Sequence, residues 1–300
     1  MALESLSKSL GSDALLDILV GGTLLGALYA LIAVGLNVQY GVTRILNLAY
    51  GELLMIGAYI TYLFFNSYGI NPLITLIMSG FIVSILGVLI QILIFRRIIS
   101  QSKSAMELEF KSLLACFGLI FIIQNVLVQY FGATPIGVPY LREGVSMLGE
   151  RFELNKIVAA VISVIISAIM YVFIRFTRWG MAMRATAEEP TGAQLVGINI
   201  LKIHAVSFSL GCLAAALAGS MLCMIYSNLD PYSGTQYALI ALIILVLGGR
   251  GSFIGSVVGG LIVGYTYYIF LKITPSLAIP AVYILLILIL IVKPKGLFGR

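Results

Sequence analysis

Charged residues are scarce in this sequence. Only 10% of its 300 residues are Asp, Glu, Lys or Arg, whereas 61% are hydrophobic. Soluble domains carry about 25% charged residues, so this chain has too few to cover a large core in water. We therefore expect lipid to surround most of it. We interpret the net charge of +6 from where the charged residues lie along the chain, and we do not take it as a sign of nucleic-acid binding.

Residues and motifs for catalysis or metal binding are also lacking. The three cysteines lie in apolar runs without CxxC spacing, which predicts neither a disulfide nor a metal ligand set. HExxH, GxSxG and the phosphate loop GxxxxGK followed by Ser or Thr do not occur. The single histidine, His204, follows Lys202 where an apolar run begins, so we expect it at the membrane interface. The sequence thus predicts no cofactor, no metal site and no enzyme.

Long apolar runs make up most of the chain. A helix needs about 20 apolar residues to cross the hydrocarbon core of a membrane, and it satisfies its own backbone hydrogen bonds there. No basic segment or cleavage site precedes the first run, so we interpret it as a mature span. We predict an all-α polytopic membrane protein with a single domain over 1–300 and eight to nine crossings. The runs lie near 15–38, 45–66, 72–95, 111–131, 156–176, 203–227, 235–249, 254–272 and 277–292.

The distribution of Lys and Arg predicts an orientation, because cytoplasmic loops carry an excess of both. If the C-terminus is cytoplasmic, nine crossings would place the N-terminus outside. Eight crossings would place it inside, and one run would then be re-entrant, with 45–66 and 235–249 as the candidates. We assign the more basic side, and the C-terminus with it, to the cytoplasm. That side receives Arg96, Arg97, Lys103, Lys111, Arg175, Arg178, Arg184, Lys202, Lys293, Lys295 and Arg300, and the other receives Lys8, Arg142, Arg151, Lys156 and Lys272.

Glycines recur at four-residue spacing between residues 248 and 264. Gly251, Gly255 and Gly259 form one row, and Gly260 and Gly264 form a second. Such rows let helix backbones approach closely in lipid. We favour packing within the chain, with contact to a second membrane subunit as the alternative.

Several polar side chains fall within apolar runs. Glu52 is the clearest, because an ionisable group inside the membrane is costly and points to function by default. We slightly favour the structural alternative, in which Glu52 pairs with Arg44 or caps a helix start at the interface. Other polar residues would line a translocation pathway or bond neighbouring helices together. These are Asn37, Gln39, Asn47 and Asn125, with Gln124 beside them.

A polar segment, 177–202, separates two apolar runs. Pro190 suits the first turn of a helix, with Glu188 and Glu189 at its positive end. Gly197 offers the stop, and Asn199 is suited to cap the next span. The pattern predicts a short cytoplasmic helix over about 190–196 with a mixed surface. Such a helix could lie on lipid or dock into a partner's groove.

Four blocks spread over the chain resemble one protein family. They are LNLAYGELLMIGAY (46–59), GMAMRATAEEPTGAQLVGIN (180–199), LGGRGSFIGSVVGGLIVG (247–264) and KPKGLFG (293–299). Together they resemble the LivH-like permease subunits of bacterial branched-chain amino acid ABC importers. The glycine-rich block alone is less specific, because sugar permeases share it. The usual coupling signature begins Glu-Ala-Ala, and this segment follows a looser version.

The resemblance implies a system of parts in a bacterial inner membrane. A second, related permease would pair with this one, two cytoplasmic ATPases would dock on the segment 177–202, and an extracytoplasmic binding protein would dock on the loop 131–156. That loop could equally be an ordinary solvated connection. The implied coupling residues are Arg184, Ala185, Glu188, Glu189, Pro190, Ala193, Leu195 and Gly197.

The implied activity is import of leucine, isoleucine and valine by alternating access, driven by ATP that the partner subunits bind. Two alternatives stay open. The permease could serve another small solute, such as other amino acids, amides or urea. The chain could instead be a secondary transporter that works alone.

Overall fold

The computed structural model describes residues 12–147 and 150–299. Lys8 and Arg300, which entered the charge argument, lie outside these ranges. Apart from one short hairpin, the described chain is helical. The helices are α2 (Ser12–Thr43), α3 (Tyr50–Tyr68), α4 (Pro72–Ile90), the π-helical turn η1 (Gln91–Phe95), α5 (Arg96–Gln101), α6 (Ala105–Phe131), α7 (Leu154–Phe176), α8 (Arg178–Glu188), α9 (Pro190–Leu195), α10 (Ile200–Ile225), α11 (Ser233–Gly248), α12 (Phe253–Ile273), the 3₁₀ turn η2 (Pro275–Leu277) and α13 (Ala278–Val292).

Each predicted apolar run contains a helix, and the chain is an all-helical polytopic membrane protein. Seven helical segments in the described residues are long and apolar enough to cross a membrane. They begin in α2, α4, α6, α7, α10, α12 and η2. The helices α3 and α11 are not among them, and they correspond to 45–66 and 235–249, the two candidate re-entrant runs. By length and composition the described chain therefore gives seven spans, and the eight or nine crossings stay a prediction.

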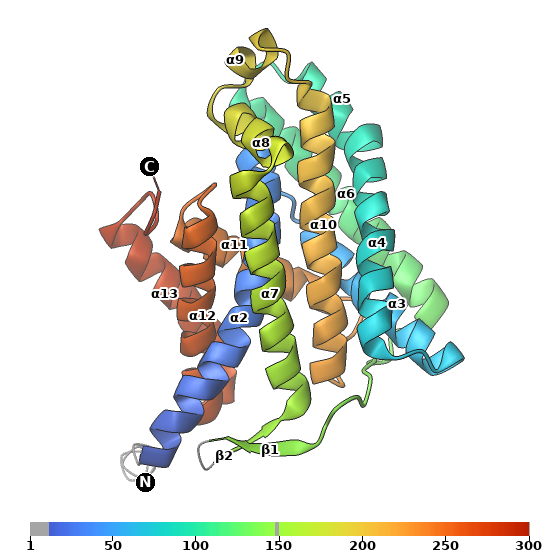
Figure 1. Ribbon diagram of the computed structural model, residues 1–300, viewed down its shortest axis with the longest axis vertical. Helices are drawn as coiled ribbons and strands as arrows, with labels where there is room; N and C mark the ends of the chain where they lie inside the picture. Colours follow the sequence, from blue (N-terminus) through green and yellow to red (C-terminus); the bar gives the residue numbers. More distant parts are fainter. Residues whose placement is uncertain (1–11, 148–149, 300) are drawn as a thin grey trace.

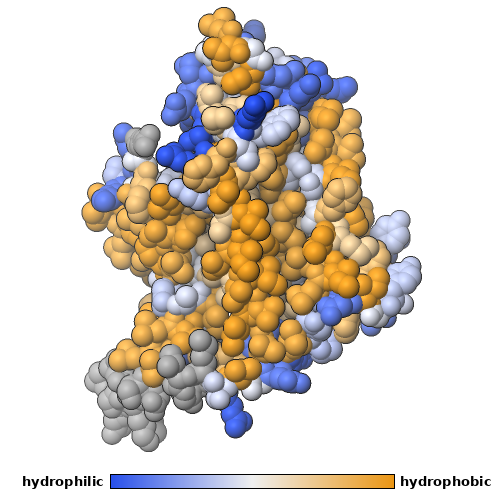
Figure 2. Space-filling view, viewed as in Figure 1, coloured by the Kyte–Doolittle hydropathy of each residue, from blue (hydrophilic) through white to orange (hydrophobic). Residues whose placement is uncertain are grey.

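The two ends of the molecule along its long axis differ in composition from its sides. Figure 1 shows α8 and α9 at one end and the β-hairpin with the start of α2 at the other. Hydrophilic residues gather at the two ends, and a broad apolar band lies between them (Figure 2). This distribution is what a bilayer requires of a protein that exposes its sides to hydrocarbon.

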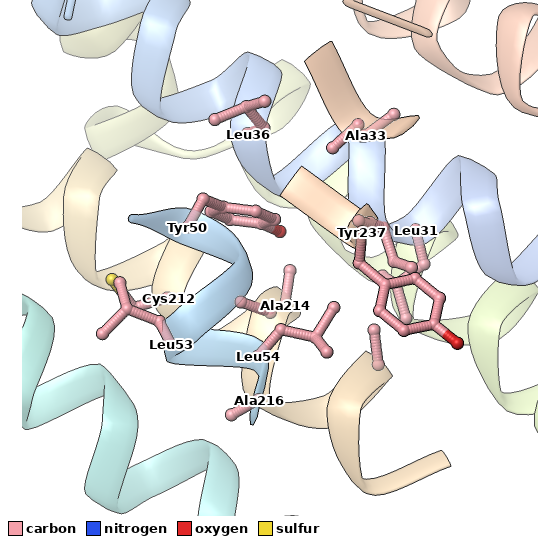
Figure 3. Packing of buried hydrophobic residues seen from close by; sticks show 14 of the residues in the cluster. Leu31, Ala33, Leu36, Tyr50, Leu53, Leu54, Cys212, Ala214, Ala216 and Tyr237 are labelled. Atoms are coloured by element: carbon pink, nitrogen blue, oxygen red, sulfur yellow. The ribbon is translucent and has the colours of Figure 1, made fainter. Parts of the chain in front are cut away.

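The core is built around α2 and α10, which are the most deeply buried spans. Helix α10 contacts α2, α3 and α4, and α2 also contacts α7 and α12. Small residues on α10 make this possible, because they let neighbouring backbones approach. In Figure 3, Leu53 and Leu54 of α3 pack beside Ala214 and Ala216 of α10. At Gly219 a Cβ would collide with the carbonyl oxygen of Leu54, so only glycine fits there.

The glycine rows predicted from the sequence pack mainly within the chain. Gly260 and Gly264 lie against Ala30 and Gly26 of α2. Gly255 and Gly259 lie against Gly248 and Ile244 of α11. Gly251 differs, because it precedes α12 and has φ +82°. It is therefore a turn residue and not part of a helical ridge.

The loop predicted over 131–156 is structured. It contains an antiparallel hairpin, β1 (Gly144–Met147) and β2 (Glu150–Glu153), with Val145 opposite Phe152. Ahead of the hairpin, the amide of Ile136 donates to the carbonyl of Leu229 at 2.7 Å. This bond ties the loop to the connection between α10 and α11, so it is held at the end of the molecule opposite α9 (Figure 1).

Candidate coupling segment and buried polar residues

Local sequence signals build the segment 177–202 as a pair of helices between α7 and α10. Thr177 caps α8 by accepting from the amide of Gly180 at 3.1 Å. Glu189 caps α9, and Pro190 occupies its first position. Gly197 follows with φ +86°, and Asn199 caps α10 by accepting from the amide of Lys202 at 3.1 Å. The predicted short helix lies where α9 is found, but α8 was not predicted as a separate helix.

The surface of α9 divides into an anchored side and an exposed apolar side. Leu195 is 89% exposed, and Val196 directly after the helix is 77% exposed. Ala193 is only 4% exposed, so it packs against the chain and does not belong to an outward contact surface. Val196 was absent from the predicted coupling set, although its apolar side chain beside Leu195 is the signal that could have included it. The other predicted members are exposed or half-buried around this segment: Arg184, Ala185, Glu188, Glu189, Pro190 and Gly197.

Arg44 connects the segment 177–202, called the coupling segment from here on, to the core. Its guanidinium Nη2 donates to the carbonyl of Ala187, near the end of α8, at 2.8 Å. Arg44 also has φ +57°, a left-handed conformation that is unfavourable for a residue with a side chain. It stands just after α2 and six residues before α3 begins. The bond thus links the end of α8 to the connection between α2 and α3.

Glu52 lies in the first turn of α3 and is fully buried. Its Oε1 accepts from Gln124 Nε2 at 3.0 Å and from Thr235 Oγ1 at 3.1 Å. Its Oε2 is buried and has no hydrogen-bond partner among the described residues. The favoured pairing with Arg44 is wrong, because Arg44 bonds Ala187 instead. Capping is wrong as well, because the N-cap position is Ala49 and no side chain caps α3.

Three further pathway candidates are hydrogen-bonded inside the chain. Asn37 donates from Nδ2 to the carbonyl of Ser252 at 2.8 Å and accepts from the amide of Gly251 at 2.6 Å. Gln39 donates to the carbonyl of Phe208 at 3.1 Å, and Asn47 donates to Gln39 Oε1 at 3.1 Å. All three are buried. Their polar groups are thus occupied by partners from this chain, as expected of interhelical hydrogen bonds.

Asn125 does not face the interior of this chain. Its side chain is exposed, and its Nδ2 bonds only the carbonyl of Phe121 on the same helix, at 2.7 Å. Its neighbour Gln124 is the residue of α6 that points inward, to Glu52. Of the two adjacent amides, Gln124 faces the interior of this chain and Asn125 faces outward, so a place for Asn125 in a translocation pathway stays a prediction.

His204 is buried in α10, with 6% of its surface exposed. It lies within the first two turns of α10, and its position at the membrane interface stays a prediction. Its Nδ1 has no hydrogen-bond partner in the described part of the chain. The ring borders a cavity of about 590 Å³ that also touches Pro190 and Gln194. A second cavity, of about 390 Å³, lies between the ends of α2, α7 and α8 and the turn before α12. Both cavities border the segment α8–α9.

The comparison with known proteins identifies the family. The family model described as "Branched-chain amino acid transport system / permease component" matches residues 18–293. The chain belongs to this family. It is thus the permease component of a branched-chain amino acid ABC transport system, and it is not itself catalytic. The resemblance inferred from the four sequence blocks is confirmed. An ABC system of this kind joins its permease to ATPase and binding-protein partners in general.

Relatives of this permease family match over nearly their whole length. The high-affinity branched-chain amino acid transport system permease protein LivH of Salmonella typhimurium is 31% identical over 298 residues, which cover 93% of this chain and 94% of the relative. The corresponding protein BraD of Pseudomonas aeruginosa is 29% identical over 94% of this chain and 95% of its own. The fold is shared with a solved structure, PsaBC from Streptococcus pneumoniae in complex with Fab. That match has a TM-score of 0.50 and 12% identity, and it covers 98% of this chain and 97% of the other.

Proposed function

We propose that this permease imports leucine, isoleucine and valine into a bacterial cell by alternating access, driven by two ATPases that dock on α9. The observation that carries this proposal is the exposed apolar pair Leu195 and Val196 at the end of the molecule. Leu195 ends α9 and Val196 follows it, and Figure 1 shows α9 at one end of the molecule, beyond α7 and the start of α10. Apolar side chains in that position are suited to a groove on a partner protein.

The α9 end would then face the cytoplasm. The predicted cytoplasmic Lys and Arg residues on α5, α7 and α8 support this orientation. The C-terminal tail also lies at the inner end, because the amide of Leu297 donates to the carbonyl of Leu247 at 2.8 Å, beside the turn that leads into α12. The hairpin loop 131–156 would face the binding protein on the outer side. The permease itself would hold no cofactor.

The translocation pathway would run along the junction with a second permease. Asn37, Gln39, Asn47 and Glu52 are buried and bonded within this chain, which argues against an open path through its own core. Asn125 instead presents a polar group on the outer face of α6, where a protein neighbour suits it better than lipid does. ATP would act by favouring one of two arrangements of this pair, through its different affinity for each.

Replacing Leu195 or Val196 with Asp tests the docking surface. Each change removes exposed apolar area and adds charge, so we expect co-purification with the ATPases and ATP-dependent leucine uptake to fall at least tenfold. The permease should keep its size-exclusion profile, because neither side chain is packed. The matched control is Gln194→Asp, which adds the same charge to an exposed position of α9.

Unchanged ATPase binding in both Asp variants would contradict the proposal. Gradient-driven uptake by the purified chain in liposomes, without ATP, would support the alternative of a secondary transporter. Uptake of amides or urea in preference to leucine by the complete system would support the alternative of another small solute.

A further inference from the structure

A basic cavity lies at the inner end of the bundle, beside the coupling segment. Its volume is about 390 Å³, within the range typical of ligand sites. Apolar side chains from the spans line its deeper part, including Val34 and Val38 of α2 and Ile174 of α7. Three arginines from three different segments line it as well: Arg44, Arg184 and Arg250. Charge and apolar surface thus meet in one cavity.

The three guanidinium groups form no ion pair among the described residues, although Glu188 lines the same cavity. Arg44 and Arg184 bond main-chain carbonyls, at 2.8 and 3.2 Å. Arg250 lies over the ring of Tyr40 and donates to its hydroxyl at 3.4 Å. In the described residues no carboxylate lies within 4.0 Å of any of the three. The Nε of Arg184 is buried and has no hydrogen-bond partner there. Leaving such a donor unsatisfied is costly, so an added anion would be stabilised.

The position of the cavity indicates where that anion comes from. The cavity is lined by residues near the ends of α2 and α7 and near the start of α12, where these spans end on the side of α8 and α9. Figure 2 shows the border between the apolar band and the hydrophilic end on this side of the molecule. If the α9 end is cytoplasmic, as the proposed function requires, the cavity faces the leaflet that carries anionic lipid.

We propose that this cavity binds the headgroup of an acidic phospholipid. The phosphate would accept hydrogen bonds from Arg184 and Arg250, since guanidinium groups bind phosphate in a bidentate manner. The upper part of an acyl chain would lie against Val34, Val38 and Ile174. Glu188 also lines the cavity, and it could instead pair with the ammonium group of a free amino acid. That second occupant is therefore an arm of the test.

The single tryptophan of the chain provides the measurement. Trp179 lies in α8, four residues before Met183, which lines the cavity. Residues four apart share one face of a helix. The full-length permease is placed in vesicles with brominated phosphatidylglycerol or brominated phosphatidylcholine, and quenching of the tryptophan fluorescence is recorded. We expect several-fold preferential quenching by the acidic lipid.

Replacing both arginines, in Arg184→Gln with Arg250→Gln, should remove the preference, so that the two lipids quench about equally. Replacing both with Lys should keep most of it. The matched control is Arg96→Gln with Arg97→Gln, which removes the same charge from exposed positions at the same end and should change the preference little. Equal quenching by both lipids, or an equal loss in the control, would overturn the proposal.

Leucine is then added to the vesicles in place of the brominated lipid. A fluorescence change that depends on Arg184 and Arg250 and saturates with leucine would show that the cavity takes the amino acid, which also overturns the lipid assignment. Because no ATPase is present, failure of the docking test at α9 would leave this result intact, and a failure here would leave the docking test intact.

Discussion

The coupling segment and the core around α10 differ in which side chains they bury and which they expose. In the core, buried polar side chains such as Gln39 and Asn47 are bonded to each other, and glycines bring backbones into contact. In the coupling segment, apolar side chains such as Leu195 stand exposed, and two cavities border α8 and α9. The difference teaches that burial does not follow polarity along this chain: polar side chains are enclosed by bonding partners in the core, whereas apolar side chains stay exposed at the α9 end.

Glycine substitutions test this contrast most strongly. In the core, Gly219→Ala would place a Cβ onto the carbonyl oxygen of Leu54. Because the backbone must move to make room, we expect the free energy of unfolding to fall by about 3 kcal/mol or more. Little monodisperse protein should then appear in size-exclusion chromatography. In the coupling segment, the Cβ added by Gly197→Ala would meet nothing within 4 Å, but the residue has φ +86°. We therefore expect the free energy of unfolding to fall by about 1 kcal/mol.

Gly118→Ala is the control for these two variants, because it also meets open space and has no left-handed φ. It should change the melting temperature by no more than about 2 °C, the shift expected for a surface substitution of this kind. Equal behaviour of Gly219→Ala and Gly118→Ala would contradict the close contact between α10 and α3.

Glu52 gives the next largest effect in the core. Glu52→Leu removes the acceptor for Gln124 and Thr235, which would leave two donors with less hydrogen bonding inside the bundle. Such losses cost about 1–3 kcal/mol. Glu52→Gln keeps a carbonyl oxygen for these donors, so its stability should lie between that of Glu52→Leu and that of the natural chain. Thermal unfolding in detergent measures both. Full stability of Glu52→Leu would show that the cluster does not hold α3, α6 and α11 together.

Local rules could predict the coupling segment, because its form depends on neighbours in sequence. Pro190, Gly197 and Asn199 each act within about one helical turn, and the structure places the start of α9, the turn after it and the cap of α10 there. The seven apolar spans were predictable for the same reason, since length and composition decide them.

The partners of buried polar residues could not be predicted in this way. Glu52 bonds Gln124, which is 72 residues away, and Arg44 bonds Ala187, which is 143 residues away. Such pairs depend on how whole helices rotate and pack. A pairing chosen by closeness in sequence, such as Arg44 with Glu52, therefore failed. The burial of His204 also depends on the neighbours of α10, and no local pattern reports them.

The adjacent amides Gln124 and Asn125 give the smallest and most discriminating test. Gln124→Leu removes the donor to Glu52 inside the chain, so we expect a loss of about 1–3 kcal/mol in the isolated permease. Asn125→Leu removes only a bond to its own helix and faces outward, so the isolated chain should change by less than about 0.5 kcal/mol. If α6 meets the second permease, Asn125→Leu should still weaken pairing and transport in the complete system. Equal destabilisation of the isolated chain by both variants would contradict the assignment of one amide to the core and the other to the outer face.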